Sequence, residues 1–221
     1  MVANAKLDYP VEPQAIAAFE SGELLVSGVV SSFRQGSGSE RKEYFAGIFT
    51  RDGLLLQKVD LGRNTQISRE ASITQDGSAE PDATDATNMA RAGRADSQSV
   101  YLMQWHPQGP AFLLISSEGK VVHTIQISSP ERAKLRDVRF AEGKLVAAFM
   151  KTIKLPGNPR GVLATDSEIF QVLNTENGEK LAEYERRRPF LGNLACYASD
   201  TFMFLRVGEN RRLELVRAEA Y

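Results

Sequence analysis

The sequence predicts an all-β protein that resembles a β-propeller, with about four antiparallel blade modules and one long inserted loop. The main observation is a hairpin pattern that recurs: an apolar strand, a polar turn that ends on glycine, and a second alternating strand. The pattern closes at Gly53, Gly119 and Gly178, which lie 66 and 59 residues apart. This spacing is too long for consecutive hairpins, so each hairpin ends a larger module, as in the blades of a propeller.

A second hairpin type, which closes at Gly22 and Gly143, precedes the first type within a module. Glycine suits both types because tight hairpin turns require a positive φ. Two hairpins in series make the four antiparallel strands of one blade. We therefore interpret residues 1–221 as a single propeller-like domain, with blades at about 15–62, 90–128, 134–186 and 191–221.

The strands themselves are expected to have one apolar and one polar face. Three short segments alternate in this way and predict apolar residues inward and polar residues outward: 54–59, 121–125 and 213–216. Helix is the less favoured alternative for two segments. Residues 12–18 have the sequence for a single helical turn, and residues 83–95 have the sequence for a short surface helix.

The fourth blade is one strand short. Its sequence contains three strands, at 193–197, 201–207 and 212–217. An uncovered edge strand invites aggregation. We therefore expect that residues 5–9 complete the blade as a short strand, or that another chain covers the open edge.

Residues 68–97 are polar and rich in Ala, Asp and Gly, and Ile73 and Met89 are their only large apolar residues. Such a segment has little apolar surface to offset the entropy lost on ordering. We expect a long rim loop that contributes to partner contact.

The composition excludes several classes of protein. Apolar residues make up 42% of the chain and charged residues 25%, which is typical of a globular protein. A formal net charge of −1 gives no reason to expect a nucleic-acid partner. No apolar run approaches the length of a membrane span.

Cys196 is the only cysteine, so no intrachain disulfide forms. The first ten residues show no apolar signal core, and the compartment stays open.

The blade-forming residues resemble the later part of a group of uncharacterised bacterial six-bladed β-propeller proteins. The resemblance rests on residues 21–28, 45–49, 52–53, 194–197, 202–205 and 215–219. It implies a propeller fold and supplies no catalytic residues. Members of the group usually carry an export signal and further blades before this region, so the resemblance favours an exported protein, periplasmic or extracellular, without its leader. The chain is then either a portion of a larger propeller or a four-unit relative.

Candidate binding residues lie near strand ends and on the expected rim. Aromatic side chains offer contact area and a polar group together, and the candidates of this kind are Tyr44, Tyr101 and Trp105, with His106 beside them. The basic run Arg186, Arg187 and Arg188 forms a second candidate, with Arg160, Arg211 and Arg212 as neighbours. The alternative for this run is a solvated turn that Glu183, Glu185 and Glu209 largely neutralise.

Catalytic and metal-binding patterns are weak, and we predict neither a metal nor a cofactor. His106 and His123 are the only histidines, and together with Cys196 they are too scattered for a zinc site. We interpret His123 as a solvated strand residue and Cys196 as a small core residue. The acidic stretch 76–85 contains calcium-type ligands but lacks the spacing of an EF-hand loop.

Two classes of function remain open. The first is a non-catalytic binding or assembly module that engages a protein or glycan through its rim loops, with a protein partner or a second copy covering the open blade edges. The alternative is a hydrolase or lyase that works in the central funnel through Asp137, Glu168 and Asp200, with or without a metal. Convergence of these carboxylates in space distinguishes the two.

Overall fold

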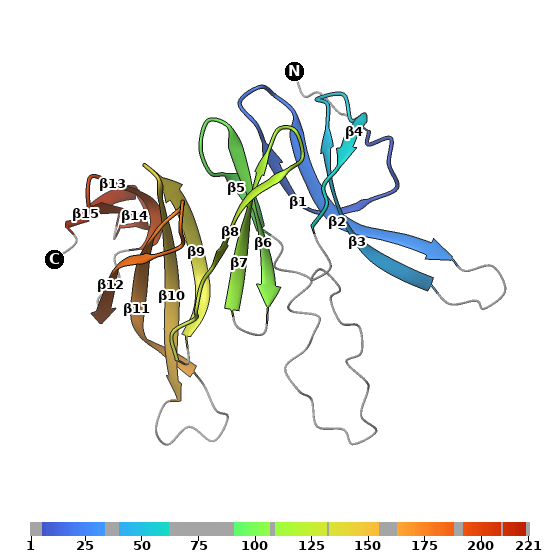
Figure 1. The fold of residues 1–221 in the computed structure, drawn as a ribbon. Coiled ribbons are helices and arrows are strands. Elements are labelled where there is room, and N and C mark those ends of the chain that lie inside the picture. Colours follow the sequence, from blue (N-terminus) through green and yellow to red (C-terminus); the bar gives the residue numbers. More distant parts are fainter. Residues whose placement is uncertain are drawn as a thin grey trace, which may run out of the picture. The chain divides into compact units, whose positions relative to one another are not determined.

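The computed structural model describes residues 6–33, 40–61, 91–106, 109–131, 133–154, 163–187, 192–208 and 210–219. Within them the chain forms only strands, arranged in four antiparallel sheets (Figure 1). This confirms the predicted all-β class. No helix in the described part has the length and apolar character needed to cross a membrane.

Each sheet is an up-and-down meander in which strands adjacent in the sequence are adjacent in the sheet. The first two sheets have four strands each. The first consists of β1 (Glu12–Ala18), β2 (Leu24–Phe33), β3 (Glu40–Phe49) and β4 (Leu55–Lys58). The second consists of β5 (Arg91–Arg94), β6 (Ser99–His106), β7 (Gly109–Ser116) and β8 (Val121–Gln126).

The third sheet again has four strands and the fourth has three. The third consists of β9 (Ala133–Ala141), β10 (Lys144–Lys154), β11 (Leu163–Asn174) and β12 (Lys180–Arg187). The fourth consists of β13 (Asn193–Ala198), β14 (Thr201–Val207) and β15 (Leu213–Glu219). All five glycines predicted to close hairpins adopt a positive φ: Gly22, Gly53, Gly119, Gly143 and Gly178.

The predicted loop (68–97) and the predicted second blade (90–128) overlap, and within the overlap Arg91–Arg94 forms strand β5 rather than loop. It pairs with β6 from Arg91↔Met103 to Arg94↔Val100. Residues 62–90 lie outside the described part of the chain. The helical turn considered at 12–18 is strand β1, because Ala15 and Ala17 alternate with exposed Ile16 and bury against the core.

Residues 6–9 do not complete the fourth sheet. The backbone N–H of Asp8 donates to the carbonyl of Gly53 (3.0 Å), and Asp8 Oδ1 accepts from the N–H of Leu55 (2.7 Å). The Tyr9 ring stacks on Phe45 with the centroids 4.4 Å apart. The segment is held here because the apolar face around Phe45 requires cover, so the fourth sheet remains three-stranded.

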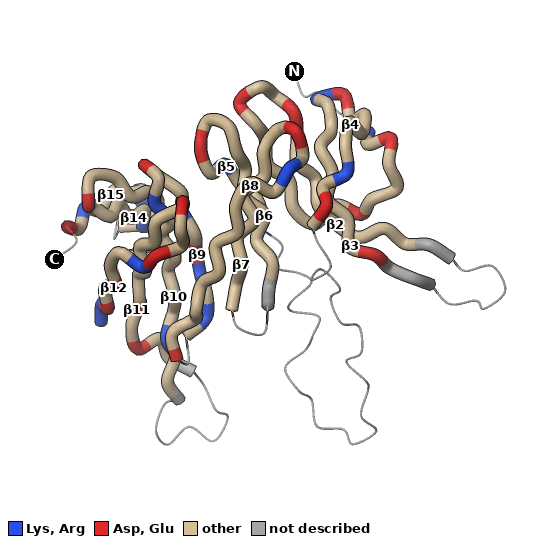
Figure 2. Tube along the Cα trace, viewed as in Figure 1, with Lys and Arg blue, Asp and Glu red and all other residues tan. Residues whose placement is uncertain are grey.

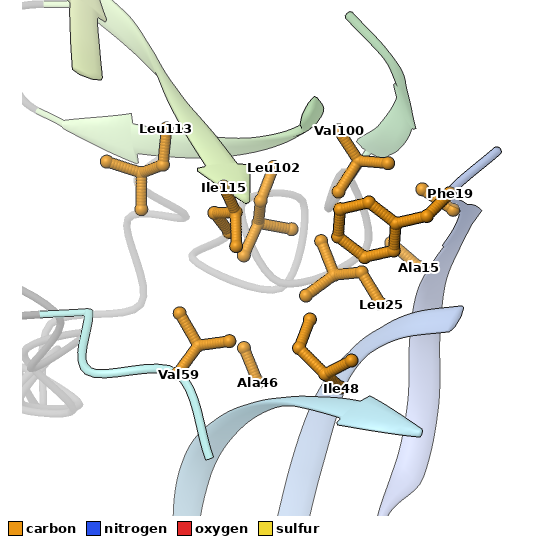
Figure 3. Packing of buried hydrophobic residues seen from close by; sticks show 11 residues of the cluster. Ala15, Phe19, Leu25, Ala46, Ile48, Val59, Val100, Leu102, Leu113 and Ile115 are labelled. Atoms are coloured by element: carbon orange, nitrogen blue, oxygen red, sulfur yellow. The ribbon is translucent and has the colours of Figure 1, made fainter. Parts of the chain in front are cut away.

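The described chain forms two compact units. Unit 1 comprises residues 1–106 and 111–124, and unit 2 comprises residues 107–110 and 125–221. In unit 1 the first and second sheets bury a shared core (Figure 3). Phe19, Leu25 and Ile48 contribute from the first sheet, and Leu102 and Ile115 from the second. Packing two sheets face to face in this way removes both inner faces from water.

Unit 2 has a core rich in aromatic rings between the third and fourth sheets. Phe170 on β11 lies 5.2 Å from Phe202 and 5.5 Å from Phe204, centroid to centroid. Phe202 also contacts Tyr197 at 4.9 Å and Tyr184 at 5.4 Å. Such tilted and edge-on ring pairs add to the stabilisation from area burial.

Replacing a buried leucine of unit 1 should lower the free energy of unfolding much more than replacing an exposed one. Leu25 is fully buried, so L25A should lower the free energy of unfolding by about 2–5 kcal/mol, since it leaves a cavity. The matched control is L56A, because Leu56 on β4 is 57% exposed; this change should have an effect within about 0.5 kcal/mol. Urea unfolding followed by circular dichroism measures both. Equal losses would contradict the described packing.

Candidate functional site

Two predicted aromatic site residues are part of the packing of unit 1. Tyr44 lies half-buried against the core; burial raises the pKa of its phenol, and the nearby Ser27 hydroxyl acts in the opposite direction. The Tyr101 ring meets Phe112 edge-on at 5.9 Å and also covers Gly93, where a Cβ would come within 2.8 Å of the ring. Both side chains therefore support the sheets.

Trp105 and His106 end strand β6, as the sequence suggested for their backbone. Their side chains lie outside the described part of the structure, so their predicted binding role stays a prediction. The acidic stretch 76–85, considered for calcium, and Arg160 also lie outside it.

The basic run is divided by the end of β12. Arg188 lies outside the described residues, whereas Arg186 and Arg187 are the last two residues of the strand. In the sheet register Arg186 is directly opposite Glu168 and Arg187 is opposite Ser167. The charge of Arg186 acts on the Glu168 carboxylate, which joins a predicted binding residue to a predicted catalytic one.

Glu168 is the most deeply buried carboxylate described in unit 2, with its side chain 4% exposed. Its Oε1 accepts a hydrogen bond from Arg136 Nη1, and Arg136 Nη2 donates to Asn193 Oδ1 on β13. Burial raises the pKa of Glu168, and the charges of Arg136 and Arg186 oppose that rise. Its Oε2 has no hydrogen-bond partner among the described residues. Arg136 thereby links the third sheet to the fourth, a structural role that the sequence did not indicate.

Asp137 and Asp200 hold local structure. Asp137 Oδ1 accepts from the backbone N–H of Val138 and from Arg139 Nη1, each at 2.8 Å. Asp200 Oδ1 accepts from the Tyr197 hydroxyl at 2.7 Å and from Lys144 Nζ at 3.0 Å. These bonds lower the pKa of Asp200. Burial, with the bond to Asp200 second, raises the pKa of the Tyr197 phenol.

Asp200 lies far from Glu168 along β10, whereas Asp137, opposite Ala148, and Glu168, opposite Met150, are only two positions apart in the register. Lys144, the partner of Asp200, lies six residues along β10 from Met150, which is opposite Glu168. At about 3.3 Å per residue this separation is about 20 Å. The part of the chain that is described also contains no group of three or more His, Cys, Asp or Glu placed to hold a metal ion.

His123 differs from its predicted solvated state. It is half-buried on β8, and its Nε2 is shielded from solvent without a hydrogen-bond partner in the described structure. Cys196 is a free, half-buried thiol on β13. The structure brings neither residue together with the other predicted site residues through a described hydrogen bond or ion pair.

The fourth sheet exposes an apolar surface that the sequence analysis assigned to the interior. In the register of β14 and β15, Leu205 is opposite Leu215 and Val207 is opposite Leu213. These four residues, the aliphatic face, are exposed by 41% (Leu205), 57% (Leu215), 67% (Val207) and 71% (Leu213). The alternation at 213–216 was recognised correctly, but its inward and outward sides were reversed. Val216 is opposite buried Phe204, so the side of β15 that carries Val216 faces the core and the side that carries Leu213 and Leu215 faces outward.

Comparison with known proteins adds little. No family model matches the chain, and no curated protein matches it. One similar solved structure is the hydrazine synthase of Kuenenia stuttgartiensis, at 13% identity and a TM-score of 0.36. The match covers 95% of this chain and 62% of the other, so the present chain spans less than two thirds of that protein's length. A similarity this distant implies neither activity nor partner.

The burial of Glu168 predicts a specific pH dependence of stability. Because its folded pKa is raised above the ordinary value of 4.5, the folded protein holds this proton more tightly than the unfolded chain does. This contribution to stability is fully present below about pH 4.5 and is lost as the pH rises through the raised pKa. From about pH 4 to about pH 7, the wild type should therefore lose free energy of unfolding relative to E168Q.

The control for this measurement is E118Q. A hydrogen bond from Lys120 lowers the pKa of Glu118, so its contribution has the opposite sign and is lost as the pH falls. Glu118 is fully exposed, and we expect a small effect. Parallel pH profiles for the wild type and E168Q would show that the description of Glu168 is wrong.

Proposed function

We propose that this protein is a non-catalytic binding and assembly module, and that a second copy of the chain packs against its fourth sheet. The observation that carries this proposal is the aliphatic face on β14 and β15. Four neighbouring Leu and Val side chains, each 41–71% exposed, form a continuous apolar surface. Exposed patches of this kind mark interaction sites more often than scattered single residues do.

The fourth sheet carries apolar side chains on both faces. Its inner face buries Leu194, Phe202 and Phe204 in the core of unit 2. Its outer face presents the aliphatic face to solvent among the described residues. A sheet with two apolar faces requires a layer on each of them. The first sheet meets this requirement within its own unit, since Leu7, Tyr9 and Val11 pack on the face that carries Phe45 and Phe49.

The edge of the same sheet favours a second copy as the partner. Among the described strands β15 pairs with β14 alone, so it is an edge strand of the sheet. Two β15 strands related by a two-fold axis pair antiparallel, which is the symmetry of a closed dimer.

The charges on β15 are compatible with such pairing. When two copies pair about Val216, Glu214 faces Ala218, Arg217 faces Leu215, and Glu219 faces Leu213. No charged residue then lies opposite a like charge, which would destabilise the pair. The aliphatic faces of the two copies then lie on the same side of one joined sheet, with Arg217 and Glu219 of each copy opposite Leu215 and Leu213 of the other.

The predicted role of the rim loops remains a prediction, because residues 62–90 lie outside the described chain. For the enzyme alternative, Asp200 is separated from Glu168 along β10, and each of the three carboxylates accepts hydrogen bonds from neighbouring side chains or backbone.

A matched pair of substitutions tests the dimer. Leu215 on β15 and Leu56 on β4 are both 57% exposed, and both strands are sheet edges. We expect the wild type to be dimeric and L215K to be monomeric, because the lysine lies opposite Arg217 of the second copy and the two like charges repel. L56K should remain dimeric. Sedimentation equilibrium over a series of protein concentrations measures all three. A wild type that is monomeric throughout, or an L215K variant as dimeric as L56K, would refute the second-copy assignment.

A further inference from the structure

We infer that a cleft in unit 1 with a mixed polar and apolar lining binds a neutral carbohydrate. The cleft encloses about 460 Å³, which lies within the usual range for small-molecule sites. Three hairpin turns form its rim, at 19–23, 95–98 and 116–120. It lies in the other unit from the aliphatic face, so this inference is independent of the proposed dimer.

The lining of the cleft is hydroxyl- and amide-rich. Ser97 and Ser117 contribute hydroxyls and Gln98 contributes a carboxamide. The Ser21 hydroxyl, also in the lining, donates to the Glu23 carboxylate, and the Ser116 hydroxyl is shielded from solvent. Hydroxyl and carboxamide groups both donate and accept hydrogen bonds, as the hydroxyls of a sugar do. This lining favours a polyhydroxylated ligand over an apolar one.

The charges at the cleft compensate each other. Glu118 and Lys120 are the charged residues of the lining, and they form an ion pair with an N···O distance of 2.8 Å. Just outside the lining, Arg94 is likewise paired with Glu20. Strand β7, which ends at Ser116 in the lining, carries no charged residue (Figure 2). Neither a phosphate nor a cationic ligand finds an uncompensated charge here.

An apolar part of the lining completes the match to a sugar ring. Phe19 and Val122 lie in the cleft, and Val122 is 59% exposed. A pyranose ring presents C–H groups on its faces and hydroxyls at its rim. It can therefore pack against Val122 while its hydroxyls reach the serine and glutamine side chains.

The turns that carry these groups are fixed by their own hydrogen bonds. Asp96 Oδ1 accepts from the N–H groups of Gln98 and Ser99, each at 2.7 Å, and so positions Ser97 and Gln98. Burial opposes ionisation of Asp96, but the bonds from Ser99 and from these backbone groups outweigh it and lower its pKa.

The other two turns are closed in the same way by backbone bonds. Gly22 N–H donates to the carbonyl of Phe19 (3.1 Å), and Gly119 N–H donates to the carbonyl of Ser116 (2.9 Å). Both glycines have the positive φ that these turns require. A preformed rim reduces the entropy lost when a ligand binds.

Saturation-transfer NMR with the full chain tests this inference. The probes are glucose, maltose, cellobiose and lactose as neutral sugars, with glucuronate and glucose 6-phosphate as charged counterparts. We expect transfer to at least one neutral sugar and weaker transfer to its charged counterpart. The double variant S97A/Q98A should lower the affinity about tenfold, because two hydrogen-bonding groups are lost.

The control is S128A, which removes an exposed serine hydroxyl outside the cleft and should bind like the wild type. Circular dichroism of each variant confirms that it is folded. Three results would overturn the inference: no transfer to any neutral sugar, equal binding by S97A/Q98A and the wild type, or preferred binding of the charged sugars.

Discussion

The structure depends on one constraint: a β-sheet that is apolar on both faces must be covered on both faces. The first sheet satisfies it within unit 1, because the second sheet covers one of its faces and residues 6–11 cover the other. In unit 2 the third and fourth sheets cover each other through a core of aromatic rings. In the described chain the outer face of the fourth sheet is not covered by another layer. We propose a partner at this sheet for that reason.

Charged residues in this protein hold sheets and turns together. Arg136 joins Glu168 on β11 to Asn193 on β13, and Lys144 and Tyr197 both engage Asp200 at the turn between β13 and β14. Burying an ionised carboxylate costs free energy that one ion pair only partly offsets, which agrees with the raised pKa of Glu168.

The sequence predicted those features that depend on local patterns. The glycine turns were found because a positive φ at Gly22, Gly53 or Gly178 is a property of a few neighbouring residues. The position of Asp8 was not predicted, because its hydrogen bond with Leu55 joins residues that are 47 positions apart in the sequence. The outward direction of Leu213 and Leu215 was also missed: a shift of one residue in register reverses the faces of a strand, and only the pairing with β14 determines it. The cleft was missed for the same reason, because it joins three turns that are distant in sequence.

Hydrogen–deuterium exchange of the backbone amides in β15, at about 1 µM and about 100 µM protein, tests the central claim most directly. If a second copy pairs with this edge, the amides of β15 become more protected as the concentration rises, while those of β4, the edge strand of the first sheet, exchange at the same rate. Identical exchange of β15 at both concentrations would contradict the claim that the uncovered sheet is an assembly surface.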